Sequence, residues 1–224
     1  MFQTMVASAA SETAEVIVAY SILLSIWQYA YPELADEQPA LDDIFDMIEL
    51  VRGTRSVSRL YRDIVVAGPM GVFFDPQPSG VVMNGQISSV HQTLQSLHDQ
   101  LSHPADQHAV QRLQVYLDRY ETLNNRDRLA VTWMATIADD FWVRLRSYNP
   151  HALLVLAYST LLVYASGNKC WWMSGWSERI LRACGEVLSP GVQSTIDWAY
   201  HESRIRGMAT ELGIRRQGGE GAGI

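Results

Sequence analysis

The amino-acid sequence predicts an all-α protein, a single multi-helix bundle of about eight helices around an apolar ligand pocket. Apolar residues recur at helical spacing along nearly the whole chain, and no stretch alternates apolar with polar residues as a half-buried strand does. The chain has 224 residues, of which 48% are hydrophobic and only 18% charged, so it can bury a sizeable core. We expect one helical domain over residues 1–206 and a flexible tail over residues 207–224.

The first helix is expected over residues 5–31, ending near Pro32. Its residues 16–31, VIVAYSILLSIWQYAY, carry no charge. These 16 residues fall short of the roughly 20 that cross a bilayer comfortably, and acidic rather than basic residues precede them, unlike in a signal peptide. We interpret the segment as a buried core helix and expect no membrane span, with an interfacial helix as the alternative.

The second helix is expected over residues 41–67, because apolar side chains recur there at helical spacing and Gly68-Pro69 ends the run. A loop rich in proline and glycine follows, GPMGVFFDPQPSGVVMNG. Long loops with large apolar side chains are often lids or packed loops.

Six further helices are expected toward the C-terminus. Pro150 begins one of them and Gly167 ends it, as these residue types do at the first helical position and after the last turn. The expected ranges are 86–102, 105–124, 127–147, 151–166, 169–187 and 189 to about 206.

The charge of the chain excludes one class of partner. Its net charge is −7, which argues against a nucleic-acid surface, since that surface needs a basic stripe to neutralise phosphates. Two cysteines, Cys170 and Cys184, are too few for a disulfide framework and indicate a reducing compartment. We expect a cytoplasmic protein, or a nuclear one if the chain is a fragment of a regulator.

Polar clusters that resemble metal or acid–base sites have simpler explanations. The four histidines His91, His98, His103 and His108 lack the i, i+4 spacing of a zinc site and are expected on a solvated surface. The sequence DDIFD at 42–46 matches the letters of a Mg²⁺-diphosphate motif, but no second acidic motif accompanies it, so these residues are expected to be helix N-terminal acids. One carboxylate of Asp139-Asp140 is expected to pair with Arg144 or Arg146 at the surface, and the two are not expected to act as an acid–base pair.

No phosphate-binding glycine loop and no nucleophile elbow occurs, so we expect neither a cofactor nor a metal.

The aromatic residues are the remaining candidates for a functional site. Trp172 and Trp176 lie at i, i+4 and are expected to share a helix face. Core packing explains most of the aromatic residues, while a cavity for a rigid apolar ligand is the alternative. They are Trp27, Tyr31, Trp133, Trp142, Tyr158, Tyr164, Trp171, Trp172 and Trp176.

Three stretches carry a family resemblance: VAYSILLSIWQYAYP, DDIFDMIELVRGTRSVSRLYRDIVVAGPMGVFF and NPHALLVLAYSTLLVYASGNKCWWMSGWSERIL. In order and spacing, over about residues 15–185, they resemble the C-terminal regulatory domain of fungal zinc-cluster transcription factors, in particular the sterol uptake control group. The resemblance implies an all-helical domain that takes up a sterol, with a pocket bordered by residues 151–164, Trp171–Trp176 and the turn Gly68–Phe74.

The family's DNA-binding cluster needs six cysteines, and this chain has two. We therefore expect a free-standing protein that kept the pocket, or a cut-out regulatory fragment. Together with the aromatic residues, the resemblance nominates as ligand-binding residues Trp27, Tyr31, Met70, Phe73, Phe74, Trp133, Leu154, Tyr164, Trp171 and Trp176.

The leading functional hypothesis is a cofactor-independent enzyme of fungal secondary metabolism that cyclises or isomerises a terpenoid or polyketide, as in a Diels–Alder cycloaddition. Such a site folds the substrate into one reactive conformer and aims a hydrogen-bond donor at a conjugated carbonyl. The candidate catalytic donors are Tyr158, His151, Trp172, Tyr61 and Arg52. The alternative is a non-catalytic sterol- or metabolite-binding regulatory domain. A third hypothesis is a homodimer formed through an exposed first helix.

Overall fold

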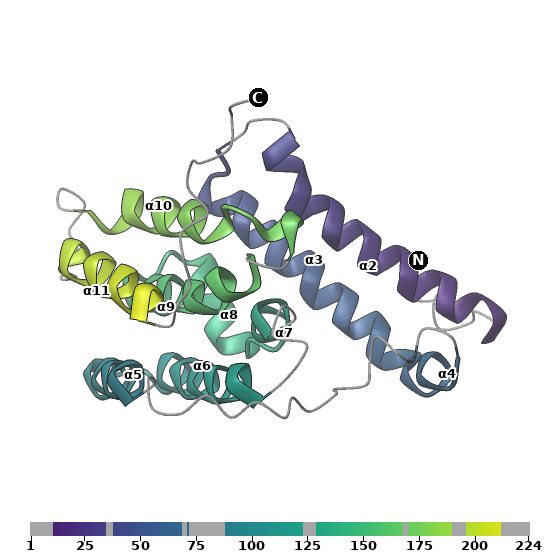
Figure 1. The fold of residues 1–224 in the computed structure, drawn as a ribbon, viewed down its shortest axis with the longest axis horizontal. Coiled ribbons are helices and arrows are strands. Elements are labelled where there is room, and N and C mark those ends of the chain that lie inside the picture. The colour runs from purple at the N-terminus through teal and green to yellow at the C-terminus, as the bar shows by residue number, and fades with distance from the viewer. Residues whose placement is uncertain are drawn as a thin grey trace.

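The computed structural model describes residues 11–34, 38–68, 71, 88–122, 129–167, 170–189 and 196–211. Every regular element in these ranges is a helix, so the expected all-α multi-helix bundle is confirmed (Figure 1). The elements are α2 (Ser11–Leu34), α3 (Leu41–Leu60), α4 (Arg62–Ala67), α5 (Ser88–Gln100), α6 (Pro104–Thr122), α7 (Leu129–Ala135), α8 (Asp139–Arg146), α9 (Pro150–Gly167), the 3₁₀ helix η3 (Trp171–Met173), α10 (Trp176–Leu188) and α11 (Trp198–Glu211).

Helix α9 is the centre of the bundle. It packs against α6, α7, α8, α10 and α11, and every residue from 152 to 164 is buried. A helix that is apolar on all sides is stable in water only when neighbours cover it. Its two buried hydroxyls bond back to the helix itself: Ser159 donates to the carbonyl of Leu156 at 2.7 Å and Thr160 to that of Ala157 at 2.6 Å. These two buried hydroxyls are therefore satisfied within the helix itself.

The start of α9 is set by a polar cluster. The Asn149 side chain accepts hydrogen bonds from the backbone N–H groups of His151 and Ala152 at 3.1 and 3.3 Å, which caps the helix ahead of Pro150. The same Asn149 oxygen accepts from Arg144 at 2.9 Å, and Arg144 also donates two hydrogen bonds to the buried Asp106 at 2.9 and 2.7 Å. These contacts join α8 to α6 and to the first turn of α9.

Helices α2 and α3 lie side by side as a separate layer of the fold, with α4 crossing their far end (Figure 1). Ser25 and Thr54 share a hydrogen bond of 2.9 Å across the two helices. A second apolar cluster of Ala14, Val18, Tyr61 and Val65 joins α2 to α4. Only one side of α2 is covered in this way, which leaves its outer face open to solvent.

Two expected helices are each divided in the structure. The helix predicted over 41–67 is interrupted at Tyr61, and the one predicted over 127–147 is interrupted at residues 136–138. At the second break, the carbonyls of Ala135 and Ile137 accept hydrogen bonds from Arg55 and Arg52 of α3. Tertiary contacts thus satisfy backbone groups that a continuous helix would have paired.

The single helix predicted over 169–187 is also two separate elements in the structure. It begins with η3, and α10 follows only after Gly175, which has a φ of 75°. The prediction that Trp172 and Trp176 share one helix is therefore wrong. The last expected helix begins at Trp198 and continues past residue 206 to Glu211, so the flexible tail does not begin at residue 207; residues 212–224 lie outside the described residues.

Candidate functional site

Aromatic rings pack closely in two parts of the interior that the structure describes. Tyr29 is the centre of one cluster, with Trp172 and Trp176 edge-on to it at centroid distances of 5.3 Å each. The Trp176 indole N–H donates to the Tyr29 carbonyl at 2.7 Å, and the Tyr29 hydroxyl donates to the Met134 sulfur at 3.3 Å. A cavity lined by Trp133 and its edge-on neighbour Phe141 measures about 10 Å³, enough for one water at most.

An apolar groove of about 370 Å³ lies on the outer face of α2 instead. Its wall on the other side is Trp171, which η3 holds beside α2 with 68% of its surface exposed. The α2 residues that line the groove are Tyr20, Leu23, Leu24, Ile26, Trp27 and Ala30. None of them carries a charge, so a ligand held there is held by apolar contact with aliphatic and aromatic side chains.

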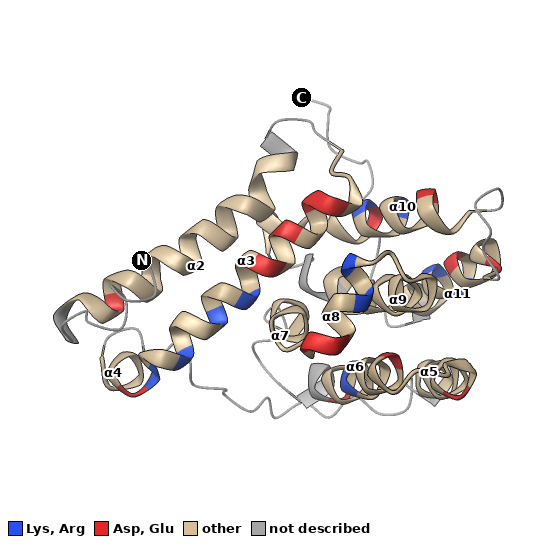
Figure 2. Cartoon of the chain, turned by 180° about the vertical axis from the view of Figure 1, so that it is seen from behind, with Lys and Arg blue, Asp and Glu red and all other residues tan. Residues whose placement is uncertain are grey.

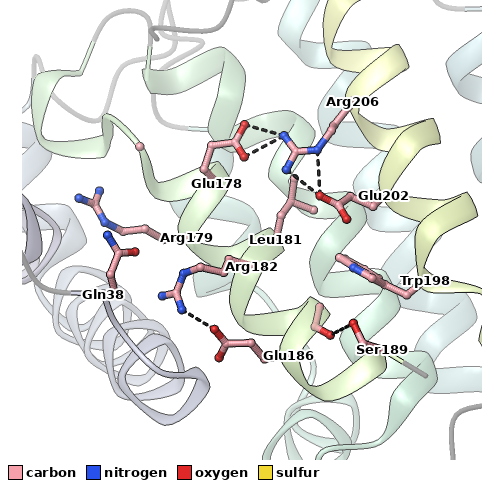
Figure 3. A pocket seen from close by; sticks show the side chains of 12 residues that line it. Gln38, Glu178, Arg179, Leu181, Arg182, Glu186, Ser189, Trp198, Glu202 and Arg206 are labelled. Atoms are coloured by element: carbon pink, nitrogen blue, oxygen red, sulfur yellow. Dashed lines mark hydrogen bonds and ion pairs between the residues drawn. The ribbon is translucent and has the colours of Figure 1, made fainter. Parts of the chain in front are cut away.

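A second, larger groove of about 670 Å³ follows α10 and α11 (Figure 3). Arg206 donates to both carboxylate oxygens of Glu178 at 2.8 Å and to Glu202 at 2.7 Å, and Arg182 pairs with Glu186 at 2.6 Å. The charged side chains along this groove therefore pair largely with one another. The lining is therefore mixed, with these ion pairs beside apolar side chains such as Leu181 and Trp198, whereas the groove on α2 is almost wholly apolar.

Three of the nominated donors, Tyr158, Trp172 and Arg52, are engaged in contacts within the fold. The Tyr158 hydroxyl lies 2.9 Å from His201 Nδ1, and burial raises the pKa of Tyr158 to about 12. His151 is in the first turn of α9 and Trp172 packs on Tyr29. Arg52 binds Asp139 and the Ile137 carbonyl, with its guanidinium 5.5 Å from the Trp142 ring centroid.

Tyr61, the fifth nominated donor, lies at the junction of α3 and α4, and its buried hydroxyl has no hydrogen-bond partner among the residues that the structure describes. None of the five donors lines the apolar groove. A donor for a reaction in that groove would have to be one of its own lining groups, the Tyr20 hydroxyl or the indole N–H of Trp27 or Trp171, rather than a nominated residue.

The nominated ligand-binding residues separate into three groups. Trp27 and Trp171 line the apolar groove, and Tyr31 lies beside Trp27 with ring centroids 6.2 Å apart. Trp133, Leu154 and Trp176 belong to the buried core, while Tyr164 donates to Glu178 at 2.7 Å. Met70, Phe73 and Phe74 lie outside the described residues.

The acidic and histidine clusters make local contacts. The Asp43 carboxylate accepts from the Ala40 backbone N–H at 2.8 Å, so its predicted role at the N-terminus of a helix is confirmed. The prediction for Asp139 is wrong, because its partner is Arg52 rather than Arg144 or Arg146. Within the ranges that the structure describes, no group of three or more His, Cys, Asp or Glu residues is placed to hold a metal ion.

Sequence reasoning missed five lining residues of the apolar groove: Tyr20, Leu23, Leu24, Ile26 and Ala30. The signal was present in the uncharged run 16–31, whose apolar residues occupy every side of the helix, so neighbours on one side leave the rest exposed. By length and hydropathy, Thr13–Pro32 is also the one described helix that could cross a membrane, a property it shares with core helices of soluble proteins.

Comparisons with known proteins identify no relative. No protein-family model, curated protein or solved structure matches this chain. The resemblance to zinc-cluster regulators therefore stays a prediction, and the geometry of the grooves carries the functional proposal.

Proposed function

We propose that this chain is a binding domain for a rigid apolar small molecule, such as a sterol, terpenoid or polyketide, held in the groove between α2 and Trp171. The observation that carries the proposal is an uncharged groove of about 370 Å³ with exposed indoles at Trp27 and Trp171. This volume falls within the roughly 300–1,000 Å³ of small-molecule sites. Flat, fused-ring ligands suit it because indole faces offer a large apolar contact area at little cost in side-chain entropy.

Binding is favoured over cyclisation, because no nominated donor lines the groove. The role that fits is the one implied by the sequence resemblance, a sensing or carrying domain, cytoplasmic or, as part of a regulator, nuclear. The cyclase remains the second candidate, since apolar confinement by itself favours a folded polyene conformer. Pairing of two copies through the first helix is a further part of the proposal.

Energy transfer from tryptophan to dehydroergosterol, a fluorescent sterol, tests the binding proposal. Trp171→Ala should weaken binding roughly 10- to 70-fold, because roughly 60–100 Å² of apolar contact contributes about 1.5–2.5 kcal/mol. Tyr200→Ala is the matched control, since Tyr200 is a half-exposed ring on α11 that lines neither side of this groove. Equal affinity of the Trp171→Ala variant and the wild type would place the ligand elsewhere.

Catalysis is tested separately with conjugated polyene substrates. Product formation above the protein-free rate, lost in the Trp171→Ala variant, would support the cyclase. Binding of the polyene without acceleration would support the sensing or carrying domain.

A further inference from the structure

The apolar groove is part of a longer stripe along α2. Val16, Tyr20, Leu23 and Trp27 follow one another at spacings of four, three and four residues, and all are between 57% and 66% exposed. This is the spacing of the seam of a two-helix coiled coil. Buried residues of the same helix, such as Val18 and Tyr29, belong to the clusters that pack against the rest of the fold. The stripe is therefore a second apolar face, which none of the helices described here covers.

The area of the stripe matches that of a stable dimer. Together with the neighbouring exposed side chains Leu24, Tyr31 and Trp171, it leaves roughly 800 Å² of apolar surface in water, given that a whole aromatic side chain presents about 150–250 Å². A monomer rarely exposes more than a few hundred Å² in one patch. Two copies that covered each other would bury roughly 1,600 Å², the size of a standard specific interface.

The charge pattern favours a second copy over a membrane surface as the occupant. Helix α2 contains no Lys or Arg, and the first basic residue of the chain is Arg52. Figure 2 shows α2 almost free of charged residues, whereas α3 and α10 carry both signs. Helices that lie on membranes carry Lys and Arg on their polar face, and a protein of net charge −7 is repelled by anionic lipid. An uncharged stripe meets its own copy without repulsion.

We propose that two copies of the chain pair through the α2 stripe about a two-fold axis, and that each copy closes the other's apolar groove. The second half of this inference rests on the proposed function. Small-molecule sites bury roughly 70–90% of their ligand, which a groove open along α2 does not achieve in one copy. Tyr20, Leu23 and Trp27 belong to both the stripe and the groove, so a partner lying on the stripe also covers the groove.

Analytical ultracentrifugation of the ligand-free chain tests the pairing. We expect a dimer at micromolar concentration. The double variant Val16→Glu/Tyr31→Glu should weaken the dimer by at least about 100-fold, since it places charges inside the interface while keeping every groove residue. Val143→Glu is the control, because Val143 on α8 is a valine with the same 66% exposure as Val16. Circular dichroism verifies that each variant is folded. A monomeric wild type, or a loss equal to that of the control, overturns the pairing.

Binding of dehydroergosterol to the same proteins tests the closing of the groove. The double variant should bind the sterol at least 10-fold more weakly than the wild type and the control. Because each dimer holds two sterols, saturating sterol should strengthen the wild-type dimer by the square of that factor, about 100-fold. Equal sterol affinity of monomer and dimer would overturn the shared site but leave the proposed function standing. A dimer that binds no sterol would leave the pairing standing and remove the proposed function.

Flotation with phosphatidylcholine vesicles tests the alternative that a membrane surface, rather than a second copy, covers the stripe. The wild type should stay with the soluble fraction. A monomer that floats with the vesicles, and a Val16→Glu/Tyr31→Glu variant that does not, would assign the stripe to a membrane and overturn the proposal.

Discussion

Replacing Trp176 by phenylalanine tests how α2 is held to the rest of the bundle. Trp176 is 1% exposed, and its indole N–H donates to the Tyr29 carbonyl of α2 at 2.7 Å. Loss of this buried hydrogen bond costs about 1 kcal/mol. The smaller ring also leaves part of a buried site unfilled, which adds about 1–2 kcal/mol. The free energy of unfolding should therefore fall by about 2–3 kcal/mol, and the Tm by roughly 5–10 °C for a chain of this size.

Urea unfolding followed by far-UV circular dichroism measures this difference. Trp171→Phe is the matched control, because the Trp171 ring is 68% exposed and its replacement should change stability by less than about 0.5 kcal/mol. A Trp176→Phe effect below about 1 kcal/mol, or equal effects of the two variants, would refute the assignment of Trp176 to the core and Trp171 to the groove wall.

Two further predictions concern single polar groups. Tyr61→Phe should leave stability unchanged or raise it by up to about 1–2 kcal/mol, because the buried Tyr61 hydroxyl has no partner in the described part of the chain. Tyr164→Phe should instead lower stability by about 1 kcal/mol, because it loses the hydrogen bond to Glu178. Urea unfolding midpoints measure both effects, and a destabilising Tyr61→Phe would contradict the first expectation. Burial lowers the pKa of His201 below its ordinary 6.5, so the neutral ring beside Tyr158 should stabilise the fold above pH 6.5, with stability falling as the pH drops below that value and through the folded pKa. Unfolding midpoints from about pH 5 to 8 should show this slope in the wild type and a smaller one in His201→Gln, and equal slopes would contradict it.

Local sequence signals placed several helices closely. The helix expected over 151–166 is Pro150–Gly167, and the one expected over 105–124 is Pro104–Thr122. Proline at the first position and glycine at the end act through their own backbone geometry, which is the same in any fold. The breaks at Tyr61 and at residues 136–138 contain neither glycine nor proline, and no local pattern marked them.

The candidate site was predicted only in part. The cluster of Trp171, Trp172 and Trp176 is visible in the sequence, but one ring is 68% exposed, one is half-buried and one is 1% exposed. Gly175 turns the chain between them, so spacing along a helix did not apply. Trp27 and Trp171, which are 144 positions apart, meet across the groove because η3 packs against α2.

By itself the sequence determined that this protein is helical and where α6 and α9 begin, because helical spacing and proline at the first helical position are local signals. Only the tertiary structure decided which side of α2 packs and which stays open. Apolar side chains surround that helix, so its periodicity marks no preferred face. The choice is made by shape, since α3, α4 and η3 fit against one side and leave the stripe of Val16, Tyr20, Leu23 and Trp27 in water.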